Sequence, residues 1–172
     1  MNNIKHPTAS LTRRFFSLLY ESLLVCAISL IALLVTIPFS LTMGSDNIVV
    51  RMIALIILLT AWACYFRITW LKVGQTLPMK VWSIRIENLN GQLISSTQAW
   101  ARFFWAVLFL AIIPAFSYYA MRFYYPPKIA FYGSLLWWIL PWGYAFFDVD
   151  KQFLYDKLSG SRTVLHKKEK KS

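Results

Sequence analysis

The chain has 172 residues, of which 58% are hydrophobic, 17% aromatic and only 15% charged. An ordinary soluble domain carries about 25% charged residues, so this composition argues against a water-exposed globular fold, and the apolar content excludes a disordered chain. The 18 Lys and Arg against 7 Asp and Glu give a net charge of +11, which suits either nucleic acid or a membrane surface as partner.

Four apolar runs, taken in chain order, are long enough to cross a bilayer as helices, which requires roughly 20 residues for a core of about 30 Å. Three of them lack charged residues, over 22–45, 103–121 and 129–147, and the run 48–66 contains only Arg51. Because these runs are apolar all round, they indicate membrane helices rather than the buried helices of a soluble α-protein. The sequence therefore predicts an all-α membrane protein with four transmembrane helices, at about residues 15–39, 48–68, 103–121 and 129–147.

The distribution of basic residues predicts the orientation of these helices. Fifteen of the 18 Lys and Arg lie before the first run, between the second and third runs, or after the fourth. The remaining three are Arg51, near the start of the second run, and Arg122 and Lys128, between the third and fourth runs. Because cytoplasmic loops carry the excess of Lys and Arg, both termini are expected in the cytoplasm. The charges flank membrane helices, so the expected partner is the lipid bilayer and not nucleic acid.

The segment between the second and third spans is expected to form a small cytoplasmic β-hairpin. Val81–Glu87 alternates imperfectly between apolar and polar residues, and Asn90-Gly91 separates it from Gln92–Ile94. An Asn-Gly step between short alternating runs is a hairpin signal. Ser95 and Gln98 have the spacing of a capping box, which predicts that the third membrane helix begins there.

After the fourth span, the sequence predicts a short interfacial helix and then a basic cytoplasmic tail. Apolar residues at 153, 154 and 158 alternate with charged ones before Gly160, which favours a short helix with a glycine stop. The basic tail at 165–172 attracts anionic lipid head groups, or is a solvated end that fixes topology.

The sequence contains no pattern typical of an enzyme. His6 and His166 are the only histidines, and they lie near the two ends of the chain, so no Ser-His-Asp or Cys-His arrangement is expected among the spans. Metal-protease motifs, phosphate-binding glycine loops and paired acids within one span are also missing. We therefore expect a protein that is not an enzyme and that carries no cofactor or metal.

Glu21 is the unusual residue, because it lies about two helical turns inside the first apolar run. A charge at the centre of a membrane helix costs about 2.5–3.5 kcal/mol, and less nearer the interface. One interpretation is an ion pair with Arg102 or Arg67 that locks two spans together. Another is a protonatable or cation-binding carboxylate that faces a water-filled cavity. The third is a side chain that snorkels to the inner surface.

Four motifs are spread over most of the chain. They are Arg13-Arg14 with the acid at Glu21, Gly74-Gln75-Thr76 with the segment that follows to Ile86, the arginine at Arg102, and the closing segment Phe147–Val164. Together they resemble the RDD family of small bacterial membrane proteins, which is named for one arginine and two aspartates. The resemblance covers residues 1–164 as one membrane domain and implies location in the bacterial cytoplasmic membrane.

The resemblance also implies a polar site, here Arg13 or Arg14, Glu21, and Asp156 with Asp150 as a second candidate, together with Arg102 and the loop motif Gly74, Gln75 and Thr76. Glu21 replaces the family's aspartate but keeps the carboxylate. The implied role concerns transport of ions or small solutes across the membrane. The alternative is a non-catalytic scaffold or accessory subunit, with a second copy of the chain or other membrane proteins as partners.

Overall fold

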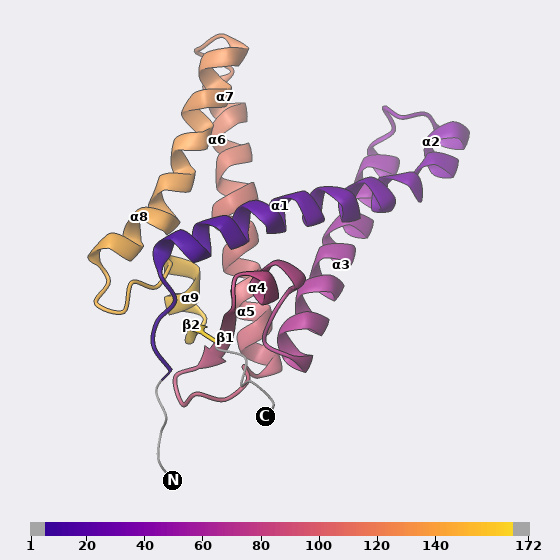
Figure 1. The fold of residues 1–172 in the computed structure, drawn as a ribbon. Coiled ribbons are helices and arrows are strands. Elements are labelled where there is room, and N and C mark those ends of the chain that lie inside the picture. Colours follow the sequence, from indigo (N-terminus) through magenta and orange to yellow (C-terminus); the bar gives the residue numbers. More distant parts are fainter. Residues whose placement is uncertain (1–5, 167–172) are drawn as a thin grey trace.

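The computed structural model describes residues 6–166 and is built mainly of helices (Figure 1). Three helical stretches, Leu11–Leu34, Ile48–Val81 and Ser96–Met121, are long and apolar enough to cross a membrane. Many of their large apolar side chains, such as Leu23 and Leu30, are exposed, and few are buried. Helices that expose apolar side chains all round are typical of membrane spans, so this part of the prediction is confirmed.

The first two long helices begin at side-chain caps. The hydroxyl of Ser10 accepts a hydrogen bond from the backbone N–H of Arg13 at the start of α1 (Leu11–Leu34). After α1 the chain forms the short helix α2 (Ile37–Met43), with Pro38 in its first turn, where a missing N–H is tolerated. The side chain of Asn47 then caps α3 (Ile48–Lys72).

The third span is helical throughout but changes its winding near the middle. It consists of α5 (Ser96–Val107), the π-helical turn η1 (Leu108–Ile112) and α6 (Ile113–Met121). Ser95 and Gln98 form the predicted capping box at its start. Pro114 has no N–H to donate to the carbonyl of Leu110, which accounts for the break in the regular α-helical pattern at this point.

The fourth predicted span is helical from residue 127 to 147 but is divided into three pieces. These are α7 (Pro127–Leu135), the 3-10 turn η2 (Leu136–Trp138) and α8 (Ile139–Phe147). Pro141 cannot donate to the carbonyl of Trp137, so the helix is also interrupted by a proline here. The two breaks meet, because Trp138 Nε1 donates a hydrogen bond of 3.0 Å to the carbonyl of Leu110.

The predicted hairpin between the second and third spans is wrong. Strand β1 (Ile84–Asn88) pairs antiparallel with β2 (Ser161–Leu165), which comes from the end of the chain, with Ile86 opposite Thr163. The Asn90-Gly91 turn does form, and Asn88 N–H donates to the carbonyl of Gln92 at 2.8 Å. The chain then continues to the cap of α5 instead of returning along β1, because the backbone groups of Ile84 and Ile86 on that edge already bond to Gln75 and Gly74, while β2 pairs with the other edge.

Two short helices accompany the sheet. They are α4 (Leu77–Val81), which follows α3, and α9 (Leu154–Leu158), which is the predicted short helix before Gly160. Figure 1 shows the strands and these helices together at the lower end, with the α6–α7 hairpin and α2 extending upward. Leu165 belongs to β2, and the basic residues of the predicted tail at 167–172 lie outside the described residues.

The main hydrophobic core lies beside the sheet and not between the long helices. Its buried residues are Ala9, Trp70, Met79, Ile84, Ile86, Ile94 and Ala99. They come from the N-terminal segment, the end of α3, α4, β1, the segment between β1 and α5, and the start of α5. This core fixes the lower ends of the long helices against one another, and the polar residues described next lie beside it.

Candidate functional site

The loop motif at residues 74–76 joins α3 to the sheet. Gly74 has a φ of +72°, and a Cβ there would lie 2.8 Å from the carbonyl oxygen of Ile86, so only glycine fits without strain. The side chain of Gln75 donates to the carbonyl of Ile84 at 2.7 Å. Thr76 caps α4, since its hydroxyl accepts from the N–H of Met79. Each of the three residues of the motif is therefore required by the local geometry of the connection between α3, α4 and β1.

Glu21 lies on α1 and receives two hydrogen bonds from neutral hydroxyl groups. Tyr65, on α3, donates to Oε1 at 2.7 Å, and Thr76 donates to Oε2 at 2.5 Å. Glu21 is only 6% exposed. Among residues 6–166, no Lys, Arg or His nitrogen lies within 4.0 Å of its carboxylate. Glu21 is thus a buried acid that is hydrogen-bonded but has no ion-pair partner in the described part of the chain.

A second cluster joins two arginines through one carboxylate. Asp156, on α9, is fully buried and forms ion pairs with Arg14 of α1 and Arg102 of α5. Both arginines are almost completely buried, at 1% and 4% exposed. The hydroxyl of Thr163 also donates to Asp156, at 3.2 Å. Because breaking a buried pair leaves a charge without compensation, this cluster fixes three separate helices to one another.

Both arginines also donate hydrogen bonds outside the ion pairs, although the Nε of Arg14 has no hydrogen-bond partner within the described residues. Arg14 donates to the backbone carbonyl of Lys151, a residue whose φ of +51° lies in the left-handed region, and Arg102 donates to the hydroxyl of Ser161 at 2.8 Å. The Arg14 guanidinium lies 3.8 Å from the centre of the Phe153 ring. Arginine stacks readily on aromatic faces, so both hydrogen bonds and rings keep these groups in place.

Aromatic and charged groups near α9 extend this cluster toward the surface. The Arg102 guanidinium lies 5.2 Å from the centre of the Tyr155 ring, and burial raises the pKa of that phenol, so it stays neutral. Lys157 Nζ pairs with Asp148 at 2.8 Å. The hydrogen bond to Asp148 raises the pKa of Lys157. Burial raises the pKa of Asp148, but the hydrogen bonds from Lys157 and the Gln152 backbone lower it overall.

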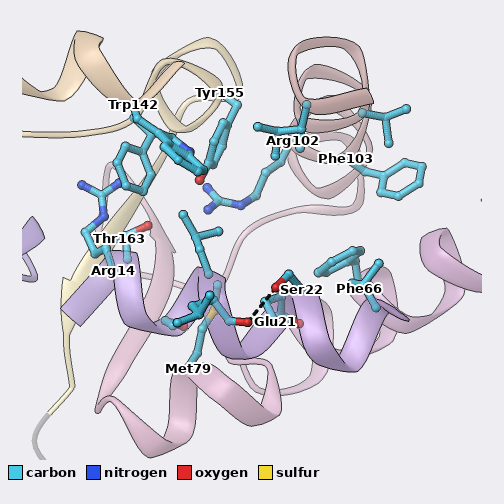
Figure 2. Close-up of a pocket in the computed structure, with 18 of the residues that line it drawn as sticks. Arg14, Glu21, Ser22, Phe66, Met79, Arg102, Phe103, Trp142, Tyr155 and Thr163 are labelled. Carbon is cyan, nitrogen blue, oxygen red and sulfur yellow. Dashed lines mark hydrogen bonds between the residues drawn. The ribbon is translucent and has the colours of Figure 1, made fainter. Parts of the chain in front are cut away.

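The two clusters border a cavity of about 570 Å³ between α1, α3, α5 and α8. Figure 2 shows Arg102 reaching into this space from one side and Arg14 and Glu21 lying along α1 on the other. Aromatic and aliphatic side chains form most of the wall. The cavity therefore combines an apolar interior with a few charged groups near the sheet, an arrangement common in small-molecule sites.

The structure brings together four of the six residues suggested by the sequence for the polar site: Arg14, Glu21, Arg102 and Asp156. Arg13 points elsewhere, and its guanidinium donates to the carbonyl of Trp82 at 3.1 Å. Asp150 is exposed.

The ion pair considered for Glu21 with Arg102 or Arg67 does not form. Arg102 pairs with Asp156, and Arg67 donates to Ser96 at 3.4 Å. Nor does Glu21 snorkel to a surface, since its carboxylate is hydrogen-bonded in the interior.

The sequence did not reveal two sets of residues that contact the charged groups of the site. Tyr65 was treated as part of an apolar span, although a hydroxyl in such a run needs a hydrogen-bond partner and could have been matched to Glu21. Ser161 and Thr163 belong to the closing motif segment but were not assigned to the polar site, because their contact with Arg102 and Asp156 depends on where β2 lies. Within residues 6–166 no three His, Cys, Asp or Glu side chains gather in a way that could hold a metal ion.

Three long apolar helices, exposed apolar faces and a buried charge cluster at one end define a helical protein of the membrane type. The RDD family model matches residues 8–160, which is most of the chain, and the chain belongs to the RDD family. No curated protein and no solved structure matches it.

Proposed function

We propose that this chain is a four-span protein of the bacterial cytoplasmic membrane that takes part in moving ions or small solutes, with Glu21 as the group that exchanges a proton or binds a cation. The observation that carries the proposal is the setting of Glu21. Its carboxylate is buried, lines a cavity and has only neutral hydroxyl partners among residues 6–166. Ionisable residues inside membrane helices are costly and typically mark ion or substrate pathways.

Four spans with both termini in the cytoplasm are supported by contacts between the two ends of the described chain. Thr8 forms a β-bridge with Val164, and the N–H of Leu165 donates to the carbonyl of Pro7 at 2.8 Å. Ends that touch lie on one side of a bilayer, which requires an even number of crossings. The three long helices therefore need a fourth, and the helical segment 127–147 has 21 residues, or about 31 Å at 1.5 Å per residue.

The topology is tested with cysteine labelling of intact cells. Single cysteines at Asp46 and Pro126, in a background with Cys26 and Cys64 replaced, should react with a membrane-impermeant reagent. A reporter fused after residue 171 should be active only in its cytoplasmic form. A C-terminus found outside the cytoplasm would refute the four-span arrangement.

Transport is tested by flux into proteoliposomes of the purified chain, under a pH gradient and under a sodium gradient. We expect flux above that of empty liposomes. Glu21→Gln should abolish it while leaving the melting temperature near that of the wild type, and Glu21→Asp should retain it. Glu87→Gln is the matched control, because Glu87 is equally buried but lies in β1, outside the cavity.

The second candidate function is a non-catalytic scaffold, and it is favoured by the cluster of Arg14, Arg102 and Asp156. These residues tie α1, α5 and α9 together and need no substrate to explain them. Under this alternative, wild-type proteoliposomes show no flux under either gradient. That result would refute the transport proposal, and flux retained by Glu21→Gln would refute the role of Glu21.

A further inference from the structure

The walls of the cavity beside Glu21 contain many aromatic rings on which no arginine of the described chain stacks. Such rings come from the first, second, third and fourth long helical segments: Phe15, Trp62, Phe66, Phe103, Trp138 and Trp142. The volume of about 570 Å³ lies inside the range of about 300–1,000 Å³ that is common for sites of small organic molecules. The cavity is therefore large enough for a molecule with several rings or alkyl groups.

The charged groups on the cavity wall differ in their partners, because the two arginines form ion pairs and Glu21 has only hydroxyl partners among the described residues. The arginines of the wall, Arg14 and Arg102, share the single negative charge of Asp156, so these three groups keep a net charge of +1, and they also donate hydrogen bonds to Lys151 and Ser161. Glu21 is the one carboxylate that lines the cavity within the described residues, and its partners are neutral. A positive ligand would thus meet a carboxylate that makes no direct ion pair within the described residues, whereas a negative ligand would have to compete with Asp156 for the same two guanidinium groups.

The wall also lacks the oxygen ligands that a small inorganic cation requires. Calcium, for example, takes six to eight oxygens at about 2.3–2.6 Å. The lining side chains offer few oxygens besides Glu21, Ser17 and Ser22, and most of the surface is apolar. Aromatic faces attract organic cations instead, because the ring carries negative electrostatic potential on its face.

We propose that this cavity binds a lipophilic organic cation, with its positive charge beside Glu21 and its apolar groups against the aromatic rings. This inference rests on the proposed function and names its substrate class. Phe15 and Leu19 line the cavity and are half exposed on the apolar outer side of α1, so a ligand of this kind would reach the cavity from the bilayer. Figure 2 shows Phe66 and Phe103 at one end of the space and Trp142 and Tyr155 at the other, with Glu21 along α1 below.

The test compares two probes of nearly the same shape and opposite charge, tetraphenylphosphonium and tetraphenylborate. Binding to the full chain in lipid nanodiscs is measured by equilibrium dialysis, with empty nanodiscs subtracted, and by quenching of tryptophan fluorescence. We expect saturable binding of the phosphonium and none of the borate. Glu21→Gln should weaken phosphonium binding by about tenfold or more, which corresponds to about 1.4 kcal/mol, and Glu87→Gln should leave it unchanged.

A second variant keeps the test decisive if Glu21→Gln does not fold. Ala106 lines the cavity from α5, and Ala106→Phe should reduce phosphonium binding by filling the space while leaving Glu21 intact. Preferential binding of the borate, or binding that neither variant changes, would overturn the proposal. Gradient-driven flux without phosphonium binding would refute this substrate class alone, and phosphonium binding without flux would refute transport alone.

Discussion

Replacing Asp156 with asparagine is the sharpest test of the buried cluster. The amide has nearly the shape of the carboxylate, so the substitution removes one negative charge and little else. In the wild type, that charge faces two guanidinium groups, those of Arg14 and Arg102. The variant leaves two buried positive charges close together without a counter-ion.

The magnitude follows from the burial of all three groups. Asp156 is 0% exposed, and its two partners are at most 4% exposed, so water cannot replace the lost charge. Breaking a buried ion pair in this way typically destabilises a protein by about 3–5 kcal/mol. For a chain of this size, each 1 kcal/mol lowers the melting temperature by about 2–4 °C, which gives a decrease of about 6–20 °C.

The assay is thermal unfolding of the purified protein in detergent, followed by tryptophan fluorescence. Asp46→Asn is the matched control, because Asp46 pairs with Arg51 at the surface and is 96% exposed, where ion pairs contribute little. Arg102→Gln should be milder than Asp156→Asn, since it leaves one arginine with one aspartate. Equal melting temperatures for Asp156→Asn and Asp46→Asn would refute this reasoning.

Three further predictions concern the loop, the end of the fourth helical segment and the two helix breaks. Gly74→Ala should lower the melting temperature, because the added Cβ both requires a strained φ of +72° and lies 2.8 Å from a carbonyl oxygen. Asp148→Asn should lower the melting temperature at neutral pH and make no difference in strong acid: the pKa of Asp148 is lowered from 3.8 in the folded state, so its contribution to stability is present above pH 3.8 and is lost as the pH falls further. Trp138→Phe should cost about 1 kcal/mol of unfolding free energy by removing the hydrogen bond that joins the breaks.

Each of these predictions has a control in the same chain. Gly44 has a φ of +83° but nothing within 4 Å of an added Cβ, so Gly44→Ala isolates backbone strain and should be milder than Gly74→Ala. For Asp148, the difference in melting temperature from the wild type should be constant at neutral pH and shrink below pH 3.8, and a constant difference throughout would contradict the prediction. Trp137→Phe removes a neighbouring indole that makes no such bond, and an equal loss there would argue against the Trp138 contact.

The sequence by itself determined the membrane character and the positions of the helices. Apolar runs of about 20 residues report on span location because the bilayer sets their length, and this property is local. The cap of α5 and the short helix before Gly160 were also predictable, because both depend on residues a few positions apart. The same is true of Glu21, which stands out as an acid in an apolar run.

Only the tertiary structure decided which segments meet. β1 pairs with a strand more than 70 residues away, and the nearby Asn-Gly turn is equally compatible with a hairpin, so local pattern could not choose between them. That choice places Ser161 and Thr163 beside Arg102 and Asp156 and directs the arginine away from Glu21. Burial and charge compensation depend on all the packed neighbours at once, so the partners of these groups were set by packing rather than by spacing along the chain.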